Sequence, residues 1–249
     1  MPRGHTVVRG LTPIVLSLLC LAGLLPIGQA LAGVSVFDQV TTPNKPFYLK
    51  LRTHRGPLTM GGVRGAFWID AQMVGDVLTG TDGYGFLKYS ATVAGEFTIS
   101  ARTDAGQAEG RLMVIAPSTP AVLFEVEAFA WRTLVRPRDT VAQRVMQQIA
   151  ENFKIVYLCG LIGKTAAREL IRTQNFPPSV VLVGKDRDQF AQLQHRGVQL
   201  YAVVGSPAML SAAEDHCPRR FSFEAQADAR LVKDWEDLWD QLNQQAEVP

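Results

Sequence analysis

Two carboxylates placed two residues apart are the feature of this sequence with the clearest chemical potential. Glu125 and Glu127 close a short apolar run, residues 122–129, which reads V-L-F-E-V-E-A-F. Because side chains at i and i+2 lie on one face of a strand, both carboxylates are predicted to project together where the strand ends. Such a pair could perform acid/base work or bind a cation. Open α/β sheets place their sites at the carboxyl ends of parallel strands.

The residues around this pair alternate between predicted strands and helices, which indicates a parallel sheet. Strands are expected at 122–126, 154–158, 180–183, 198–204 and 220–223. Helices are expected at 140–152, 164–173, 187–195, in a short segment ending near Asp215, and at 231–242. The helix at 140–152 has apolar residues at helical spacing and Asp139 or Thr140 as its N-cap. In the last helix, the apolar stripe is expected to pack in the core; it comprises Val232, Trp235, Trp239 and Leu242.

The preceding residues, 33–116, have the pattern of an all-β module. Strands are predicted at 47–51, 66–69, 85–89, 96–101 and 111–115, with Gly, Pro, Asn and Asp clusters between them. Short strands at this spacing are typical of a β-sandwich. The segment Pro117-Ser118-Thr119-Pro120 is then predicted to be a linker, residues 117–120, stiffened by its two prolines.

Two stretches of the β module carry a family resemblance. Residues 78–85 read L-T-G-T-D-G-Y-G, and Tyr89 is followed by A-G-E-F-T-I-S-A at residues 94–101. This pattern resembles the immunoglobulin-like modules of bacterial surface proteins. The module has no Cys…Trp…Cys framework, which excludes an antibody-type domain. The resemblance implies a spacer, a binding platform or a docking module, and the fold alone does not choose between them.

Residues 1–32 resemble a secretory leader. Arg3 and Arg9 precede an apolar stretch at 11–27, and Ala30-Leu31-Ala32 gives the small-x-small pattern of a signal-peptidase site. We therefore expect a signal peptide cleaved after Ala32, a periplasmic or secreted protein, and no stable membrane span after cleavage. A retained anchor is the alternative, because residues 11–31 could nearly span a bilayer.

Charge and cysteine content limit the functions available to the processed chain. Cleavage would remove two of the 25 basic residues and none of the 23 acidic ones, so the remaining charges balance. This balance argues against nucleic acid as a partner. Cys159 is expected to end a core strand and Cys217 to follow a distant helix, so both are predicted to be free thiols. The four histidines show no metal-ligand spacing.

The region 121–249 resembles the haloacid dehalogenase superfamily of phosphatases, nearest to its secreted or lipin-like branch. The family's first motif, an apolar strand ending D-x-D-x-T, falls on residues 122–129. Its second motif falls on residues 155–160, which include Cys159 and Gly160, and its basic third motif on Lys185. Its acidic fourth motif falls on residues 201–210, which include Ser206 and Leu210.

This resemblance implies a phosphoryl-accepting aspartate, a second aspartate as general acid/base, and a magnesium ion held with the fourth-motif acids. The chain departs from that pattern at nearly every position. Glu125 and Glu127 are one methylene too long, and misplacing a reacting group by roughly 1 Å can cost about a hundredfold in rate. The remaining departures are Phe129 for threonine, Cys159 for a hydroxyl, and Ser206 and Leu210 for the fourth-motif carboxylates.

These departures predict a pseudoenzyme, with no catalytic residues, no metal and no cofactor. The expected architecture has two domains, an immunoglobulin-like β-sandwich (33–116) followed by a degenerate, Rossmann-like three-layer α/β domain (121–249). Its expected role is a binding or accessory factor of the cell envelope with a protein partner. The candidate ligand-binding residues, which include the vestigial motif positions, are Glu125, Glu127, Gly160, Lys185 and Ser206.

Three alternatives stay open at this point. The first is a weak or altered Mg²⁺-dependent phosphohydrolase that uses Glu125. The second is a structural spacer in a larger envelope assembly. In the third, Glu125 and Glu127 are solvated or salt-bridged remnants of the ancestral site. A further motif, Gly160-Leu161-Ile162-Gly163-Lys164-Thr165, is two residues too short for a Walker A loop and is read as a strand-to-helix turn.

Overall fold

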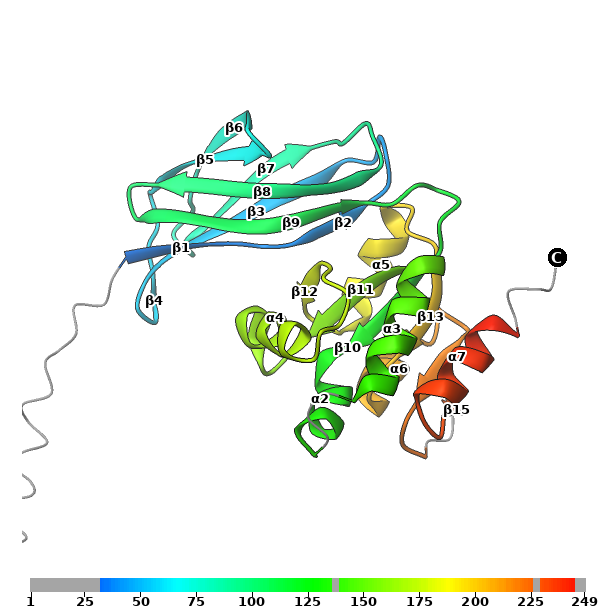
Figure 1. Cartoon of the computed structure of the whole chain (residues 1–249). Coiled ribbons are helices and arrows are strands. Elements are labelled where there is room, and N and C mark those ends of the chain that lie inside the picture. The colour runs from blue at the N-terminus through cyan, green and yellow to red at the C-terminus, as the bar shows by residue number, and fades with distance from the viewer. Residues whose placement is uncertain (1–31, 136–138, 226–228, 245–249) are drawn as a thin grey trace, which may run out of the picture.

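The computed structural model describes residues 32–135, 139–225 and 229–244. The predicted leader, apart from its last residue, lies outside these ranges, and Ala32 itself begins the first strand. The chain has a mixed architecture, with strands in three sheets and helices beside one of them (Figure 1). None of the described helices has the length and apolar character that a membrane crossing requires.

The first part is a β-sandwich of two sheets, as predicted. One sheet contains β1 (Ala32–Val36), β3 (Phe47–Arg55), β4 (Leu58–Thr59) and β7 (Tyr84–Tyr89). The other contains, in spatial order, β2 (Gln39–Thr41), β9 (Gly106–Val114), β8 (Gly95–Thr103), β5 (Arg64–Ile69) and β6 (Gln72–Leu78). Apolar side chains of both sheets meet in one buried cluster. The sequence interpretation had no strand for β1, β2, β4 or β6.

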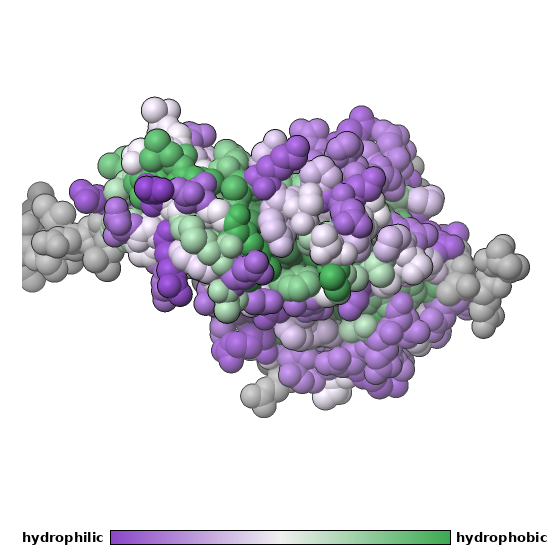
Figure 2. Space-filling view, turned by 90° about the horizontal axis from the view of Figure 1, so that it is seen from above, coloured by the Kyte–Doolittle hydropathy of each residue, from purple (hydrophilic) through white to green (hydrophobic). Residues whose placement is uncertain are grey.

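Alternation of side chains along β3 shows why this sequence forms half of a sandwich. Phe47, Leu49 and Leu51 are buried in the cluster between the sheets, whereas Tyr48 and Lys50 point to the opposite face. This is the period-2 pattern of a strand with one face packed on a core. Figure 2 shows apolar surface gathered at the sandwich end of the molecule. Exposed large aliphatic side chains of the sandwich include Leu58, Met73, Leu78 and Val93.

The second part is a six-stranded parallel sheet. Its spatial order is β12 (Val181–Val183), β11 (Lys154–Cys159), β10 (Ala121–Glu125), β13 (Leu200–Val204), β14 (Arg220–Ser222) and β15 (Arg230–Leu231). Counted along the chain, this is the doubly wound order 3-2-1-4-5-6, which reverses direction between β10 and β13. A crevice is expected at that reversal, outside the carboxyl ends of the strands. Glu125 is the last residue of β10.

Helices cover both faces of this sheet. One buried cluster joins the sheet to α2 (Val126–Val135), α3 (Thr140–Asn152), α4 (Gly163–Thr173) and α7 (Trp235–Asn243). A second cluster, on the other face, joins it to α5 (Arg187–His195) and α6 (Pro207–Ala212). The apolar stripe of the last helix lies in the first cluster, as predicted, with Trp239 only partly buried. Cys159 and Cys217 are buried free thiols, also as predicted.

Two of the boundaries that differ from the sequence prediction change where a side chain of interest lies. The strand that was expected to run through Val126 ends at Glu125, and α2 begins at once with Val126. Glu127 therefore stands in the first turn of a helix and not on the same strand face as Glu125. Leu231 lies in β15, and the last helix begins only at Trp235, after the N-cap Asp234. The helices predicted at 140–152 and 187–195 have the observed bounds.

The two parts are joined by a buried contact as well as by residues 117–120. Asp38 follows β1, and its side chain is fully buried. Its carboxylate receives the Arg168 guanidinium at 2.7 and 2.9 Å, lies 3.5 Å from Lys164 Nζ, and accepts from the Val181 amide at 2.8 Å. The second cluster also contains apolar residues of the sandwich, namely Val40, Met113 and Ile115. The connection is thus a shared core with a buried ion pair; the predicted division into independent domains stays a prediction.

Candidate functional site

A pocket of about 230 Å³ opens at the carboxyl edge of the parallel sheet, beside the reversal of strand order. It is lined by Glu125, Glu127, Ala128, Lys185, Gly205, Ser206, Ser222, Phe223 and Glu224. Four of the five candidate ligand-binding residues line it. The fifth, Gly160, lies against two of them, because a Cβ built on it would stand 3.3 Å from Lys185 Cε and 3.6 Å from Glu127 Oε1.

Glu125 is held on both of its carboxylate oxygens. The side chain is fully buried at the end of β10. Lys185 Nζ donates to Oε1, and the Ser206 backbone N–H donates to Oε2 at 2.6 Å. A carboxylate can be buried only when it is paired and hydrogen-bonded in this way. Glu125 is therefore a fixed structural anion of the pocket wall.

Glu127 is held on one oxygen only. Its Oε1 accepts from the backbone N–H of Gly160 at 2.6 Å and from that of Ile162 at 3.4 Å. A carboxylate in the first turn of α2 is also favoured by the partial positive charge at a helix N-terminus. Its Oε2 is buried, and no group of the described residues donates to it. Glu127 thus brings an unused acceptor to the pocket.

Lys185 and Ser206 come from the segments after β12 and β13. The Lys185 side chain is 29% exposed, so the cation reaches from solvent to the buried Glu125 carboxylate. Ser206 precedes α6 at the N-cap position, yet its hydroxyl makes no capping bond. That hydroxyl is buried, and none of the described residues is hydrogen-bonded to it. Two buried polar atoms in the same small pocket, Glu127 Oε2 and Ser206 Oγ, thus lack a hydrogen-bond partner among the described residues.

Three of the motif positions point away from this pocket. Cys159 is fully buried in the first hydrophobic cluster, and burial, reinforced by the negative charges of Glu127 and Asp38, raises the pKa of its thiol to about 11. Phe129 packs edge-on against Phe176 at a ring-centroid distance of 5.5 Å. Leu210 is buried in the second cluster. The pocket is consequently not plugged by Phe129, and Cys159 is not part of its lining.

The sequence interpretation missed the far wall of the pocket, Ser222, Phe223 and Glu224. Ser222 and Phe223 end the strand predicted at 220–223 and Glu224 follows it, so that strand end was the signal that could have found them. These residues come near Glu125 because β14 lies beside β13 in the sheet. The sequence of a single segment does not specify the order of strands, so this closeness could not be predicted. Among the described residues, no three His, Cys, Asp or Glu side chains are grouped closely enough to hold a metal ion.

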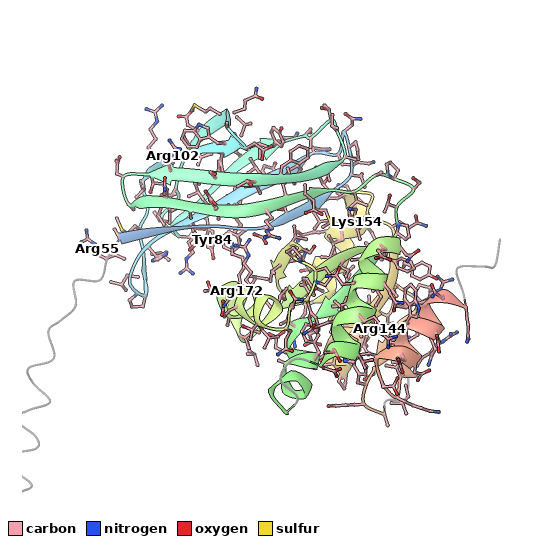
Figure 3. All side chains as sticks on the ribbon, viewed as in Figure 1. Arg55, Tyr84, Arg102, Arg144, Lys154 and Arg172 are labelled. Atoms are coloured by element: carbon pink, nitrogen blue, oxygen red, sulfur yellow. The ribbon has the colours of Figure 1, made fainter. Side chains whose placement is uncertain are left out.

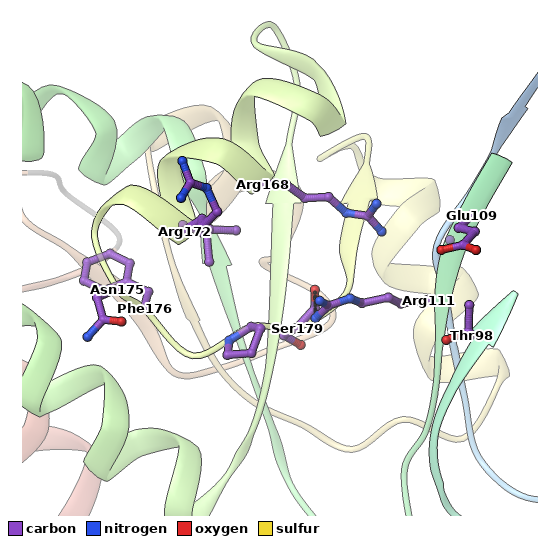
Figure 4. Close-up of a pocket in the computed structure, with 11 residues that line it drawn as sticks. Thr98, Glu109, Arg111, Arg168, Arg172, Asn175, Phe176 and Ser179 are labelled. Atoms are coloured by element: carbon purple, nitrogen blue, oxygen red, sulfur yellow. Dashed lines mark hydrogen bonds between the residues drawn. The ribbon is translucent and has the colours of Figure 1, made fainter. Parts of the chain in front are cut away.

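A larger cavity of about 560 Å³ lies at the junction of the two parts. Figure 4 shows Arg168 reaching into it from α4 and Arg111 from β9. Arg168 is bound to Asp38, and Arg172 to the neighbouring Glu169 at 2.5 and 3.0 Å. Arg111 donates to the Ser179 carbonyl at 3.5 Å. Arg168 and Arg111 thus help to hold the junction together, whereas Arg172 is paired within α4.

Comparison with known proteins gives distant structural likenesses only. No family model and no curated protein matches the sequence. Among solved structures, the fibronectin(III)-like modules of CbhA from Clostridium thermocellum are 16% identical, with 34% of this chain and 98% of that chain covered and a TM-score of 0.26. A polysaccharide lyase is 15% identical and covers 34% of this chain, but the match spans only 12% of the lyase, with a TM-score of 0.27.

One likeness extends over most of the chain. A carbohydrate acetylesterase from Xanthomonas citri is 12% identical, with 82% of this chain and 71% of that chain covered and a TM-score of 0.35. At these identities and scores the likenesses assign no activity.

Proposed function

We propose that this chain is an exported, non-catalytic binding protein, and that the pocket of Glu127 receives a small cation or a basic group of a partner. In this proposal, residues 121–249 are a degenerate haloacid-dehalogenase-like domain, and the immunoglobulin-like sandwich presents it at the cell envelope. The vestigial first motif supplies two of the three acids that line the pocket.

The observation that carries the proposal is the buried, unpartnered Oε2 of Glu127. An unsatisfied buried acceptor costs about 1–3 kcal/mol, and more when it is charged, so a donor that reaches it gains that free energy. Ser206 Oγ offers a second partner in the same pocket. A primary ammonium or a guanidinium group carries several donors and a positive charge, and it therefore matches both atoms.

The charge of the lining supports a cationic ligand. Among the described lining residues, the acids Glu125, Glu127 and Glu224 stand beside one cation, Lys185. Because Lys185 is paired with Glu125, the charges of Glu127 and Glu224 are left to act on a ligand. An anionic phosphomonoester would meet two carboxylates here without a group of metal ligands to screen them.

Calorimetric titration with ethylammonium chloride tests the binding function. The wild-type protein should bind, Glu127→Gln should lose binding because it loses the charge and presents an amide, and Glu151→Gln, an exposed acid on α3, should behave as wild type. Equal binding by wild type and Glu127→Gln would show that the ligand does not bind at Glu127.

A turnover assay separates this proposal from an enzyme. Wild type and Glu125→Gln would be compared with p-nitrophenyl phosphate and Mg²⁺. Background hydrolysis only is expected, and it should be the same in both proteins. Turnover that is abolished by Glu125→Gln would establish a phosphohydrolase in place of a binding protein.

A further inference from the structure

The outer face of one sandwich sheet combines aromatic and basic side chains in a regular arrangement. Strands β3 and β7 are antiparallel neighbours, and their outward residues form the cross-strand pairs Tyr48–Lys88, Lys50–Phe86 and Arg52–Tyr84. Each pair places one ring beside one cation. The sequence has no acidic residue at these six positions, which we call the aromatic–basic face. The residues between them on β3 point the other way, into the sandwich core.

Tyr84 and Phe86, two of the three rings of this face, are contacted by its own cations. Lys50 Nζ lies 4.2 Å from the ring centroid of Tyr84, 4.6 Å from that of Phe37 and 5.7 Å from that of Phe86. The Arg52 guanidinium carbon lies 5.5 Å from the Tyr84 centroid, and its Nε is buried without a partner among the described residues. Cation–π contacts of this kind hold the rings in place. A ligand would therefore meet a preorganised surface and lose little side-chain entropy to it.

Two rings of this face are open to solvent. The exposed fraction is 55% for Tyr48 and 51% for Phe86. Large aromatic side chains that are exposed together mark an interaction surface more often than isolated ones do. Figure 3 places Tyr84 on the lower side of the sandwich, toward the parallel sheet. The face is thus directed into the angle between the two parts.

A cleft of about 360 Å³ lies between this face and the α/β part. Tyr48, Lys50 and Phe86 form one wall. The opposite wall contains Gln189 and Gln192 of α5. Side-chain amides can donate and accept hydrogen bonds at once, which suits hydroxyl groups of either orientation. The cleft therefore offers ring faces, positive charge and amides to one ligand.

From this combination we infer that the aromatic–basic face binds an acidic polysaccharide. The apolar face of a pyranose ring packs on an exposed aromatic ring, a uronate carboxylate pairs with Lys88 or Arg52, and the ring hydroxyls reach the amides of α5. Single-stranded nucleic acid also stacks on aromatic rings beside cations. The saccharide is favoured because the amide wall suits a ligand rich in hydroxyls and because the formal net charge of the chain is only +2. This site is separate from the Glu127 pocket and does not rest on the function proposed for it.

Affinity electrophoresis of the purified protein in gels containing polygalacturonate tests this inference. The double substitution Tyr48→Ala/Phe86→Ala removes the two exposed rings. The matched control is Trp68→Ala, because Trp68 lies on the other sheet of the sandwich and also has an arginine, Arg102, over its ring at 4.9 Å. Circular dichroism of each variant verifies that the sandwich is folded.

Wild type and Trp68→Ala should be retarded equally, and the double variant should bind at least tenfold more weakly. Added salt should reduce the retardation, since part of the binding is ionic. Retardation that the folded double variant retains, or no retardation of the wild type, would overturn the inference. Tighter binding to a single-stranded oligothymidylate than to polygalacturonate would overturn the choice of ligand and assign the face to nucleic acid.

Discussion

The ammonium group of Lys185 donates to the fully buried carboxylate of Glu125, which in the proposed haloacid-dehalogenase-like domain would stand at the position of the nucleophile. The Ser206 amide occupies the other oxygen of the same carboxylate. Both oxygens of the carboxylate that would have to attack phosphorus therefore already accept hydrogen bonds. Glu127, two residues later, keeps an oxygen for a ligand.

Removing the cation of this pair should destabilise the fold. The substitution Lys185→Met leaves the Glu125 charge buried and unpaired, which is expected to cost about 3 kcal/mol of unfolding free energy. The matched control is Lys154→Met, because the Lys154–Glu96 pair is exposed at both ends and should contribute less than about 1 kcal/mol. Urea denaturation measures both values. Equal losses in the two variants would show that the Glu125 pair is not structural.

The junction of the two parts should depend on one carboxylate. Asp38→Asn removes the charge that holds Arg168 and Lys164, and it leaves two cations near an uncharged amide. A loss of about 3 kcal/mol is expected. Asp76→Asn is the control, since its Arg64 pair is exposed and worth less than about 1 kcal/mol. A free energy of unfolding unchanged by Asp38→Asn would contradict the role of Asp38 at the junction.

The buried thiol of Cys159 should make stability depend on alkaline pH. Its pKa is raised to about 11 in the folded protein, from about 9 in an unfolded chain. Between these values the unfolded state loses the proton and the native state keeps it, so the free energy of unfolding should fall as pH rises from 9 to 11. In Cys159→Ala the fall should be smaller. Urea midpoints at pH 8 and pH 10.5 measure the difference, and identical pH dependence in both proteins would contradict it.

Placing a threonine at position 129, as in the motif that the sequence resembles, should not create phosphatase activity. Phe129 is buried between Phe176 and Trp235, at centroid distances of 5.5 and 6.3 Å, and does not line the pocket. Phe129→Thr should therefore cost roughly 3 kcal/mol or more through the cavity and the buried hydroxyl, with no gain of phosphatase activity. Leu161→Thr, at a side chain that is 95% exposed, should change stability by less than about 0.5 kcal/mol. A folded, active Phe129→Thr protein would refute this placement.

Local patterns in the sequence were enough to predict several elements of the fold. The helix at 140–152 was evident from its apolar spacing and from Asp139, whose carboxylate accepts from the Val141 and Ala142 amides. The boundary at Glu125 could not be predicted, because F-E-V-E (residues 124–127) fits a strand face as well as a helix turn. That boundary is set by tertiary contacts, in which Glu127 receives the amide of Gly160 from the adjacent β11–α4 turn.

The members of the candidate site were predictable to a similar extent. Glu125, Glu127, Lys185 and Ser206 follow strand ends that the sequence reveals, and these ends meet at one edge of the sheet. Cys159 also lies at a strand end, the end of β11, but its side chain is buried in the core. Lys185 pairs with Glu125 and not with a ligand. This pairing depends on distances in the folded protein, which the spacing of residues along the sequence does not specify.

The most direct test of the account is a nuclear magnetic resonance titration with ethylammonium chloride at constant ionic strength. The backbone amides of Gly160 and Ile162 donate to Glu127, so their signals report on its carboxylate. We expect saturable chemical-shift changes of both signals in the wild type and in Glu151→Gln, and no such changes in Glu127→Gln. Unchanged signals in the wild type, or equal shifts in Glu127→Gln, would contradict it.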